Sequence, residues 1–147
     1  MRHPAVKTYI EIKMNTNILG KTTELEVLLY MTKKGVSISI PFGDKDRYDQ
    51  IRDINGELIR VQIKTAHLYT KNTGKAIEFK TTGTSNGKTT SYTKNDIDYF
   101  ATFWEGKVYV VPVEETSSKK VLRFESTINA PNISWAENYT VEEVFKI

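Results

Sequence analysis

The spacing of apolar residues predicts a helix in the N-terminal part of the chain. The order i, i+3, i+4, i+7, which places side chains on one helical face, is followed by Leu25, Leu28, Leu29 and Thr32. Gly20 precedes this segment and Gly35 follows it, and glycine commonly ends a helix. The pattern therefore predicts a helix over Thr22–Lys34 that buries these leucines.

After Gly35 the pattern changes to the alternation that is typical of β-strands, first over Val36–Ile40. The next two runs, Tyr48–Ile54 and Glu57–Thr65, flank Asn55-Gly56, a pair that favours a tight hairpin turn because both turn positions need positive φ. Further elements are predicted as strands over Ala76–Lys80, Tyr99–Trp104, Lys107–Val113 and Lys120–Glu125, a Gly- and Thr-rich loop over Thr81–Thr93, and a short helix over Thr140–Lys146. This order indicates an α+β fold, with the N-terminal helix packed on a mixed, mostly antiparallel β-sheet.

The two-residue turn also predicts the register of the first hairpin. Residue 54 then pairs with 57, 53 with 58, and Asp49 lies directly opposite Gln62. Opposed residues point to the same face of a sheet, with their Cβ atoms roughly 4.5–5.5 Å apart. Lys64 follows Gln62 by two positions and shares that face. An unbulged turn therefore brings an acid, an amide and an ammonium group together.

This trio has the chemistry of a metal-assisted hydrolytic site. Mg²⁺ prefers oxygen ligands and often takes one or two protein groups together with water and phosphate oxygens. The side chains of Asp49 and Gln62 can supply such oxygens, together with the Ile63 carbonyl, and Mn²⁺ can replace Mg²⁺. Lys64 can orient an attacking water and offset phosphate charge. Alternatively, the polar face of a hairpin, which also carries Arg60 and Asp53, groups these residues without any catalytic role.

Length and composition limit the class of protein. The chain of 147 residues fits one domain, and it contains no cysteine, which excludes disulfides and thiolate metal sites. No segment approaches the roughly 18 continuous apolar residues of a membrane span, and the N-terminus lacks the apolar core of a secretion signal. We therefore expect a cytoplasmic protein that does not associate with membranes.

Basic residues are concentrated in the middle of the chain. Between Leu58 and Asn95 there are seven basic residues and one acid, a local net charge of +6. Such a cluster is typical of a surface that binds a phosphate backbone, although a solvated basic surface has the same composition.

Several short segments, in this order, resemble the PD-(D/E)xK nuclease superfamily. Asp49 followed by Gln62-Ile63-Lys64 is similar to its D…(D/E)xK signature, and Gly20-Lys21-Thr22-Thr23-Glu24 with Gly35 is similar to its first helix. The closest likeness is to the small homing endonucleases associated with group I introns, carried by Pro41-Phe42-Gly43, Arg47-Tyr48-Asp49, Arg60-Val61-Gln62-Ile63-Lys64-Thr65-Ala66, Asp96-Ile97-Asp98-Tyr99-Phe100 and Val108-Tyr109-Val110-Val111-Pro112-Val113. This resemblance implies an α/β/α-like restriction-endonuclease core over residues 14–147, preceded by an extension over 1–13.

The resemblance implies a catalytic set of Asp49, Gln62, Lys64 and Glu24, the last from the first helix. Gln62 stands where the signature has an acid, which the intron-associated branch shares, and a neutral ligand should hold a metal less strongly. Tyr48 replaces the proline that precedes the first acid, a structural position. Asp44 and Asp46 are rival acids, but they precede the hairpin and should point elsewhere.

The implied activity is Mg²⁺-dependent cleavage of double-stranded DNA, of the site-specific homing type. The residues expected to contact DNA are Lys71, Lys75, Lys80, Thr84, Ser85, Asn86, Lys88 and Lys94. A long recognition site and so small a domain favour a homo-oligomer, a dimer or tetramer. The alternatives are a junction resolvase, a restriction enzyme, or a DNA-binding module on the same fold that does not cleave.

Overall fold

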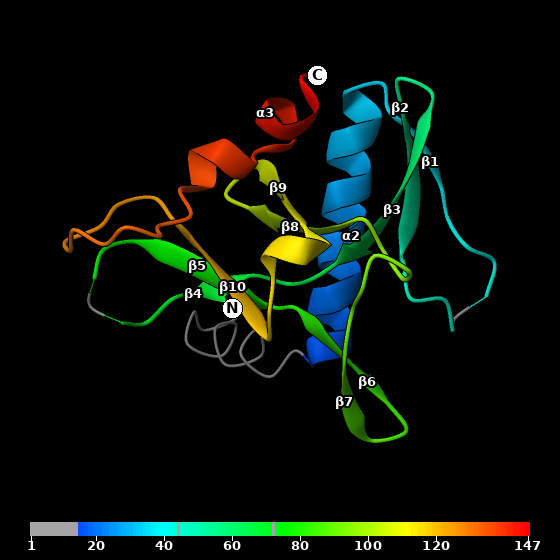
Figure 1. Ribbon diagram of the computed structural model, residues 1–147. Coiled ribbons are helices and arrows are strands. Elements are labelled where there is room, and N and C mark those ends of the chain that lie inside the picture. The colour runs from blue at the N-terminus through cyan, green and yellow to red at the C-terminus, as the bar shows by residue number, and fades with distance from the viewer. Residues whose placement is uncertain (1–14, 44, 72) are drawn as a thin grey trace, which may run out of the picture.

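A computed structural model of the protein describes residues 15–43, 45–71 and 73–147 (Figure 1). The predicted N-terminal extension, residues 1–13, lies outside the described residues, as does the rival acid Asp44. None of the described helices is long and apolar enough to cross a membrane.

Helix α2 spans Thr16–Lys33 and starts well before the predicted residue, Thr22. It starts there because Asn15 caps it, with the side-chain oxygen accepting a hydrogen bond of 3.0 Å from the Ile18 N–H. Gly20 therefore lies inside the helix. The predicted end is confirmed, because Gly35 adopts a φ of 79°, a left-handed conformation that suits glycine after a helix.

The face that α2 buries differs from the predicted one. Thr23, Val27 and Met31, spaced four residues apart, are buried, whereas Leu25 and Leu29 are 64% and 56% exposed. The prediction that the leucines are buried was therefore wrong. The leucines form the more apolar side of the helix, but the sheet contacts the other side, which carries Thr23, Val27 and Met31. A row of large apolar side chains is left on the outer surface.

The main sheet has five strands in the order β1-β2-β3-β8-β9. They span Ser37–Ser39, Gln50–Ile54, Glu57–Ile63, Tyr99–Trp104 and Lys107–Pro112. Neighbouring strands are antiparallel except β3 and β8, which are parallel. The predicted hairpin register is confirmed over five pairs, from Ile54–Glu57 to Gln50–Val61.

A second sheet and a separate hairpin follow β3 along the chain. The second sheet has the order β10-β5-β4, with strands over Lys119–Arg123, Ala76–Lys80 and His67–Leu68. The segment predicted as a loop, Thr81–Thr93, instead forms the hairpin β6 (Thr82–Ser85) and β7 (Lys88–Ser91). Its turn is Asn86-Gly87, with φ values of 50° and 74°, so the prediction missed the same turn signal as in the first hairpin.

The elements form layers around the main sheet (Figure 1). Helix α2 and the short helix α3 (Val141–Phe145) cover one face, with a core formed by Val27, Met31, Ile59, Val61, Val110 and Val141. The second sheet covers the other face, with a core formed by Ile77, Phe79, Phe100, Val111 and Leu122. Short 3-10 helices over Val113–Glu115 and Ala136–Tyr139 complete the order. The predicted α+β class, one main helix packed on a mixed sheet, is confirmed.

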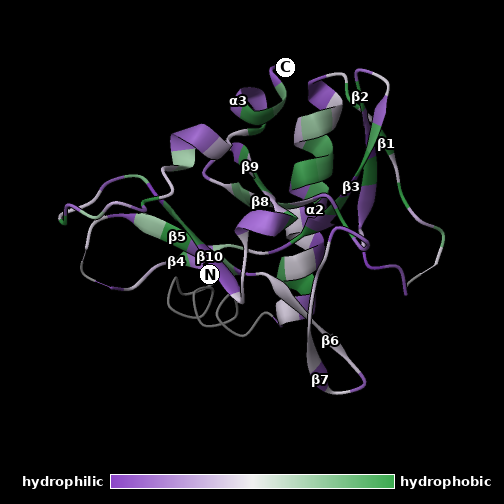
Figure 2. Ribbon diagram, viewed as in Figure 1, coloured by the Kyte–Doolittle hydropathy of each residue, from purple (hydrophilic) through white to green (hydrophobic). Residues whose placement is uncertain are grey.

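Figure 2 shows hydrophobic residues concentrated in α2 and in the central strands, whereas the β6–β7 hairpin is white to purple and carries no strongly hydrophobic residue. In Figure 1 this hairpin extends away from the body of the molecule, beyond the lower end of α2. A polar hairpin that projects from the fold contributes little to the core, so its sequence is free to serve another purpose.

Candidate active site

Asp49 lies immediately before β2 and is attached to β3 by two hydrogen bonds. Its N–H donates to the Val61 carbonyl at 2.8 Å, and its Oδ2 accepts from the Ile63 N–H at 2.8 Å. The regular ladder ends one pair earlier, at Gln50–Val61. The predicted direct Asp49–Gln62 pair is therefore replaced by this side-chain contact, which fixes the carboxylate at the Ile63 N–H.

The surroundings of Asp49 favour its neutral form. Burial raises the pKa of this carboxyl group to about 6, against the lowering effect of the hydrogen bond from Ile63. The charge of Glu24 raises the pKa further, while Lys64 and Lys21 lower it. A cation bound beside Asp49 would relieve this cost, so the site is suited to a positive ion.

Lys64 continues β3 and points toward the base of the β6–β7 hairpin. Its backbone N–H donates to the Ala101 carbonyl at 2.9 Å, which fixes the strand against β8. Its Nζ donates to the Thr82 carbonyl at 2.8 Å and lies 5.1 Å from the centre of the Tyr92 ring. Burial lowers the pKa of the ammonium group; the charge of Asp49 opposes this effect, and Arg47 and Lys80 add to it.

Gln62 and Ile63 complete the predicted metal ligands on β3. The Gln62 Nε2 donates a long hydrogen bond of 3.5 Å to the Ile63 carbonyl, and the Gln62 side chain is half-buried. The amide nitrogen therefore contacts its own strand, at the carbonyl that is also an expected metal ligand.

Glu24 reaches the same region from α2. It lines a cleft of about 260 Å³ together with Asp49, and the other lining residues are Lys21, Leu25, Leu28, Ile40 and Gln50. Lys21 lies 3.7 Å from the Glu24 carboxylate, as an exposed ion pair. The structure therefore brings the two predicted acids to one cleft. Sequence reasoning missed Gln50, which is 3% exposed, because nothing in the pattern marked it.

The site has few carboxylates with which to bind a metal ion, but its donors are oxygen atoms, which suit a hard cation. Within residues 15–43, 45–71 and 73–147, no group of three or more His, Cys, Asp or Glu side chains could hold a metal ion. The cleft offers two carboxylates, Asp49 and Glu24, and the amide oxygen of Gln62 is the further donor expected from the sequence. Such a set fits Mg²⁺, which usually retains waters and shares substrate phosphates.

A comparison with protein families identifies the class of this site. Residues 14–142 match the family described as PD-(D/E)XK endonuclease. The chain belongs to the PD-(D/E)XK endonuclease family. No curated protein matches the chain.

The fold of this PD-(D/E)XK endonuclease is similar to that of a solved bacterial homing endonuclease, I-Ssp6803I. The two share 23% sequence identity, with a TM-score of 0.65 over 86% of this chain and 89% of the other. At this identity the likeness concerns the fold, which agrees with the resemblance that the ordered segments suggested.

The residues expected to contact DNA fall into two groups in this endonuclease. Thr84, Ser85 and Asn86 line a groove of about 550 Å³ between the β6–β7 hairpin and the segment 45–47. Lys88 and Lys80 are exposed, Lys88 on β7 and Lys80 close enough to Lys64 to affect its pKa. Asp46, a rival acid, lines this groove and not the cleft of Asp49.

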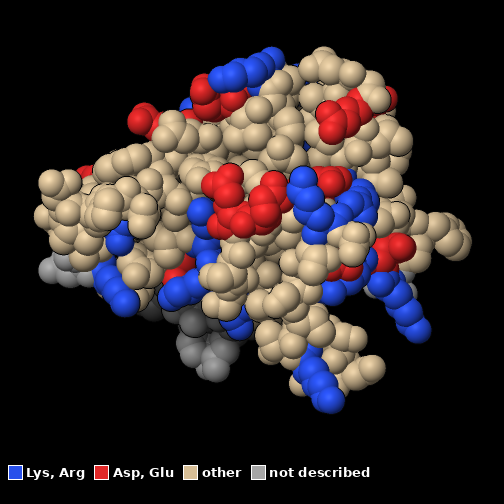
Figure 3. All heavy atoms as spheres, viewed as in Figure 1, with Lys and Arg blue, Asp and Glu red and all other residues tan. Residues whose placement is uncertain are grey.

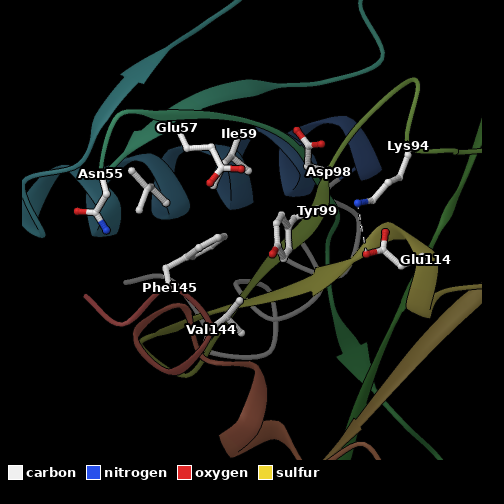
Figure 4. Close-up of a pocket in the computed structure, with 10 residues that line it drawn as sticks. Asn55, Glu57, Ile59, Lys94, Asp98, Tyr99, Glu114, Val144 and Phe145 are labelled. Carbon is white, nitrogen blue, oxygen red and sulfur yellow. Dashed lines mark ion pairs between the residues drawn. The ribbon is translucent and has the colours of Figure 1, made fainter.

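Two of the other predicted lysines already pair with carboxylates. Lys75 lies 3.0 Å from Glu105, and Lys94 lies 3.8 Å from Glu114. Figure 4 shows the second pair at a pocket of about 320 Å³, which Asp98 and Tyr99 also line. This pocket shares no lining residue with the cleft of Asp49. Lys71 is exposed, between β4 and β5.

On the face shown in Figure 3, Lys and Arg side chains gather mainly in the lower half of the molecule, around the second sheet and on the projecting hairpin. Acidic side chains lie mainly over the centre and the upper edge. On this face most basic side chains therefore lie on the same side as the hairpin.

Sequence reasoning gave no role to Arg47, whose guanidinium carbon lies 3.9 Å from the centre of the Tyr92 ring. Arg47 also pairs with Asp96 at 3.6 Å. Tyr92 is half-buried, and its ring packs edge-on against Phe100 of the core below the second sheet. The only signal for Arg47 was its place in the segment Arg47-Tyr48-Asp49, directly before the first acid.

Proposed function

We propose that the protein is a metal-dependent endonuclease that hydrolyses phosphodiester bonds of double-stranded DNA. One observation carries the proposal: Glu24 from α2 and Asp49 line one cleft, and the charge of Lys64 acts on the Asp49 carboxyl group. The family to which the chain belongs supports the nuclease chemistry.

The proposed roles follow from the chemistry of each group. Asp49, Glu24 and the Gln62 side-chain oxygen would hold Mg²⁺ or Mn²⁺, with the Ile63 carbonyl as a further donor. The bound ion would polarise the phosphate and lower the pKa of a coordinated water. Lys64 would orient the attacking water and stabilise charge on the phosphate. Its lowered pKa also means that the neutral amine, the form that can accept a proton, is more populated than in an exposed lysine.

The substrate would lie across the basic side of the molecule. We propose that Lys71, Lys80 and Lys88 contact phosphates, and that Thr84, Ser85 and Asn86 reach a groove of the duplex. Lys75 and Lys94 are less available, because each pairs with a carboxylate. A projecting polar hairpin is suited to reading base edges, and the fold likeness to a homing endonuclease supports site-specific cleavage.

Cleavage of plasmid DNA with Mg²⁺ tests the proposal. We expect wild-type protein to cleave, and Asp49→Ala and Lys64→Ala to lose at least about 100-fold in rate, since each removes a charged group from the site. Lys107→Ala, an exposed lysine at the start of β9, is the matched control and should cleave like wild type. Full activity in both site variants would overturn the site, and absence of cleavage by the wild type would overturn the function.

A second candidate function is a DNA-binding module that does not cleave, and Gln62 is the observation that favours it. A neutral amide in place of an acid weakens the hold on a metal ion. The same plasmid experiment separates the two candidates, because the module would bind DNA and leave it intact at every Mg²⁺ concentration.

We also propose that the protein acts as a homo-oligomer. Ile18, Leu25 and Leu29 lie along one side of α2 and each is at least 45% exposed, and Leu25 also lines the cleft of Glu24 and Asp49. Exposed apolar side chains gathered on one surface are typical of a contact with another protein. A second copy is the proposed occupant, because symmetric subunits would extend the length of DNA that this small domain contacts.

A further inference from the structure

Tyr92 contacts two cationic side chains, Arg47 and Lys64. Its ring centre is 3.9 Å from the guanidinium carbon of Arg47 and 5.1 Å from Nζ of Lys64. The ring itself is held by an edge-to-face contact with Phe100, with ring centres 5.2 Å apart and an interplanar angle of 83°. Because the face of an aromatic ring is electron-rich, it attracts both cations and limits where the Lys64 ammonium group can lie.

The other contact of the Lys64 ammonium group comes from the same small region. Its Nζ donates to the carbonyl of Thr82, the first residue of β6, and Tyr92 directly follows β7. Arg47 binds this base of the hairpin too, through the Ser91 carbonyl at 3.2 Å and Thr90 Oγ1 at 3.3 Å. The two ends of the hairpin thus hold the lysine between them.

Gly83 shows how tightly the hairpin base packs on Tyr92. A Cβ atom at Gly83 would lie 2.9 Å from the Tyr92 hydroxyl oxygen and 3.3 Å from Cε2 and Cζ. Gly83 is not among the glycines with positive φ, so an alanine there would meet no backbone strain. Glycine at this position therefore leaves room for the tyrosine, and a methyl group there would push against its hydroxyl end.

We propose that Tyr92 is a positioning residue for Lys64: its ring face, together with the Thr82 carbonyl, holds the ammonium group at the place where the lysine acts on the scissile phosphate. The proposal rests on the nuclease function proposed above. The ring performs this role and the hydroxyl does not, because the ammonium group contacts the face while the hydroxyl points to Gly83. The contact also links the DNA-binding hairpin to the lysine.

Two substitutions separate the ring from the hydroxyl. We expect Tyr92→Leu to lower the single-turnover cleavage rate by about 10- to 100-fold, because a reacting group that is misplaced by about 1 Å loses up to that much. DNA affinity, measured with Ca²⁺ in place of Mg²⁺, should change by less than about threefold. Tyr92→Phe should keep the wild-type rate within about threefold. An equal loss in both variants, or a loss confined to affinity, would overturn the proposal.

A double substitution tests the contact from the other side. Gly83→Ala should lower the cleavage rate in the wild-type background, and Tyr92→Phe should restore most of it, because the closest clash is with the hydroxyl oxygen. Gly20→Ala, where an added Cβ meets nothing within 4 Å, is the matched control. Equal effects of Gly83→Ala in the two backgrounds would contradict a contact through Tyr92.

An NMR measurement tests the same contact without any cleavage. With lysine labelled at Cε, the Lys64 resonance, assigned by its loss in Lys64→Arg, should be shifted upfield by the ring in wild type and in Tyr92→Phe. The shift should disappear in Tyr92→Leu. An ordinary Lys64 resonance in wild type would overturn this proposal even if the enzyme cleaves DNA. Conversely, a ring-shifted Lys64 in a protein that does not cleave would overturn the nuclease function and leave the contact in place.

Discussion

At the scale of single residues, the candidate site combines groups whose charged forms are disfavoured by their surroundings in the folded protein. Asp49 is partly buried and lies near the like charge of Glu24, and burial also disfavours the charged form of Lys64. Groups whose charged forms are penalised in this way are common at active sites, where a ligand or substrate offsets the penalty. The free protein should therefore gain stability when such a group is neutralised.

Replacement of Asp49 by Asn tests whether the ionised carboxyl group lowers the stability of the folded protein. The pKa of Asp49 is about 6 in the folded protein, above the usual value of about 3.9 for an unfolded chain. The protein therefore loses stability as the pH rises through 6, and this cost is absent below about pH 4. In EDTA, Asp49→Asn should be more stable than wild type at pH 8 by on the order of 1 kcal/mol, after allowance for solvent screening.

Chemical denaturation at pH 8 and at pH 4 measures this effect. Asp53→Asn is the matched control, because Asp53 is exposed and accepts a hydrogen bond from the Gly56 N–H that an amide oxygen can also accept. The difference between Asp49→Asn and wild type should vanish at pH 4. An equal gain at both pH values would show that the ionised form of Asp49 is not the cause.

At the scale of elements, the β6–β7 hairpin connects the body of the molecule to the proposed DNA surface. Its strands are short and polar, and its base is fixed by Arg47, by Tyr92 and by the ammonium group of Lys64. The side chains of Thr84, Ser85 and Asn86 line the groove beside it. A rigid base and an exposed tip suit an element that must place a few side chains in a duplex.

Lys88, on this hairpin, should contribute to DNA binding through phosphate charge alone. We expect Lys88→Ala to weaken binding similarly for all duplex sequences, and to reduce the slope of log affinity against log salt by about 1, because one fewer counterion is released. Filter binding or fluorescence anisotropy at several salt concentrations gives this slope. Lys107→Ala should leave the slope unchanged, and an unchanged slope in Lys88→Ala would remove the hairpin from the DNA surface.

The strands and turns also show where sequence patterns were sufficient to predict an element. The strands around Asn55-Gly56 and Glu105-Gly106 were predicted because each turn sits between two apolar runs. Asn86-Gly87 is the same kind of turn, but its flanks are Thr, Ser and Gly, so apolar alternation could not reveal the hairpin. Asn15 likewise caps α2 without an apolar pattern beside it.

At the scale of the whole molecule, the predicted packing of one main helix on a mixed sheet is present, but a second sheet covers the other face and the surface of α2 was misjudged. The rule that a helix buries its most apolar stripe fails here, since Leu25 and Leu29 remain exposed. The candidate catalytic set could be named from the sequence because its residues are close in sequence or carried by the family resemblance. The cleft shared by Glu24 and Asp49, and the position of Tyr92 beside Lys64, depend on tertiary packing that no local pattern encodes.

The exposed stripe on α2 yields a prediction about assembly. Wild-type protein should be a dimer or tetramer at micromolar concentration, and Leu25→Lys with Leu29→Lys should convert it to a monomer, because burying the added charges costs far more than the apolar contact gains. Light scattering coupled to size exclusion measures the mass. Ile128→Lys, an exposed apolar residue away from the helix, is the control. A monomeric wild type would contradict the proposal.

The central claim is that Asp49 holds the metal ion while Lys64 acts on the substrate. Mn²⁺ binding, followed by electron paramagnetic resonance and compared with DNA cleavage in the same samples, tests it most directly. We predict that Asp49→Ala loses both Mn²⁺ binding and cleavage, whereas Lys64→Ala loses cleavage and retains Mn²⁺ binding. Unchanged Mn²⁺ binding in Asp49→Ala, or full cleavage in Lys64→Ala, would contradict the account.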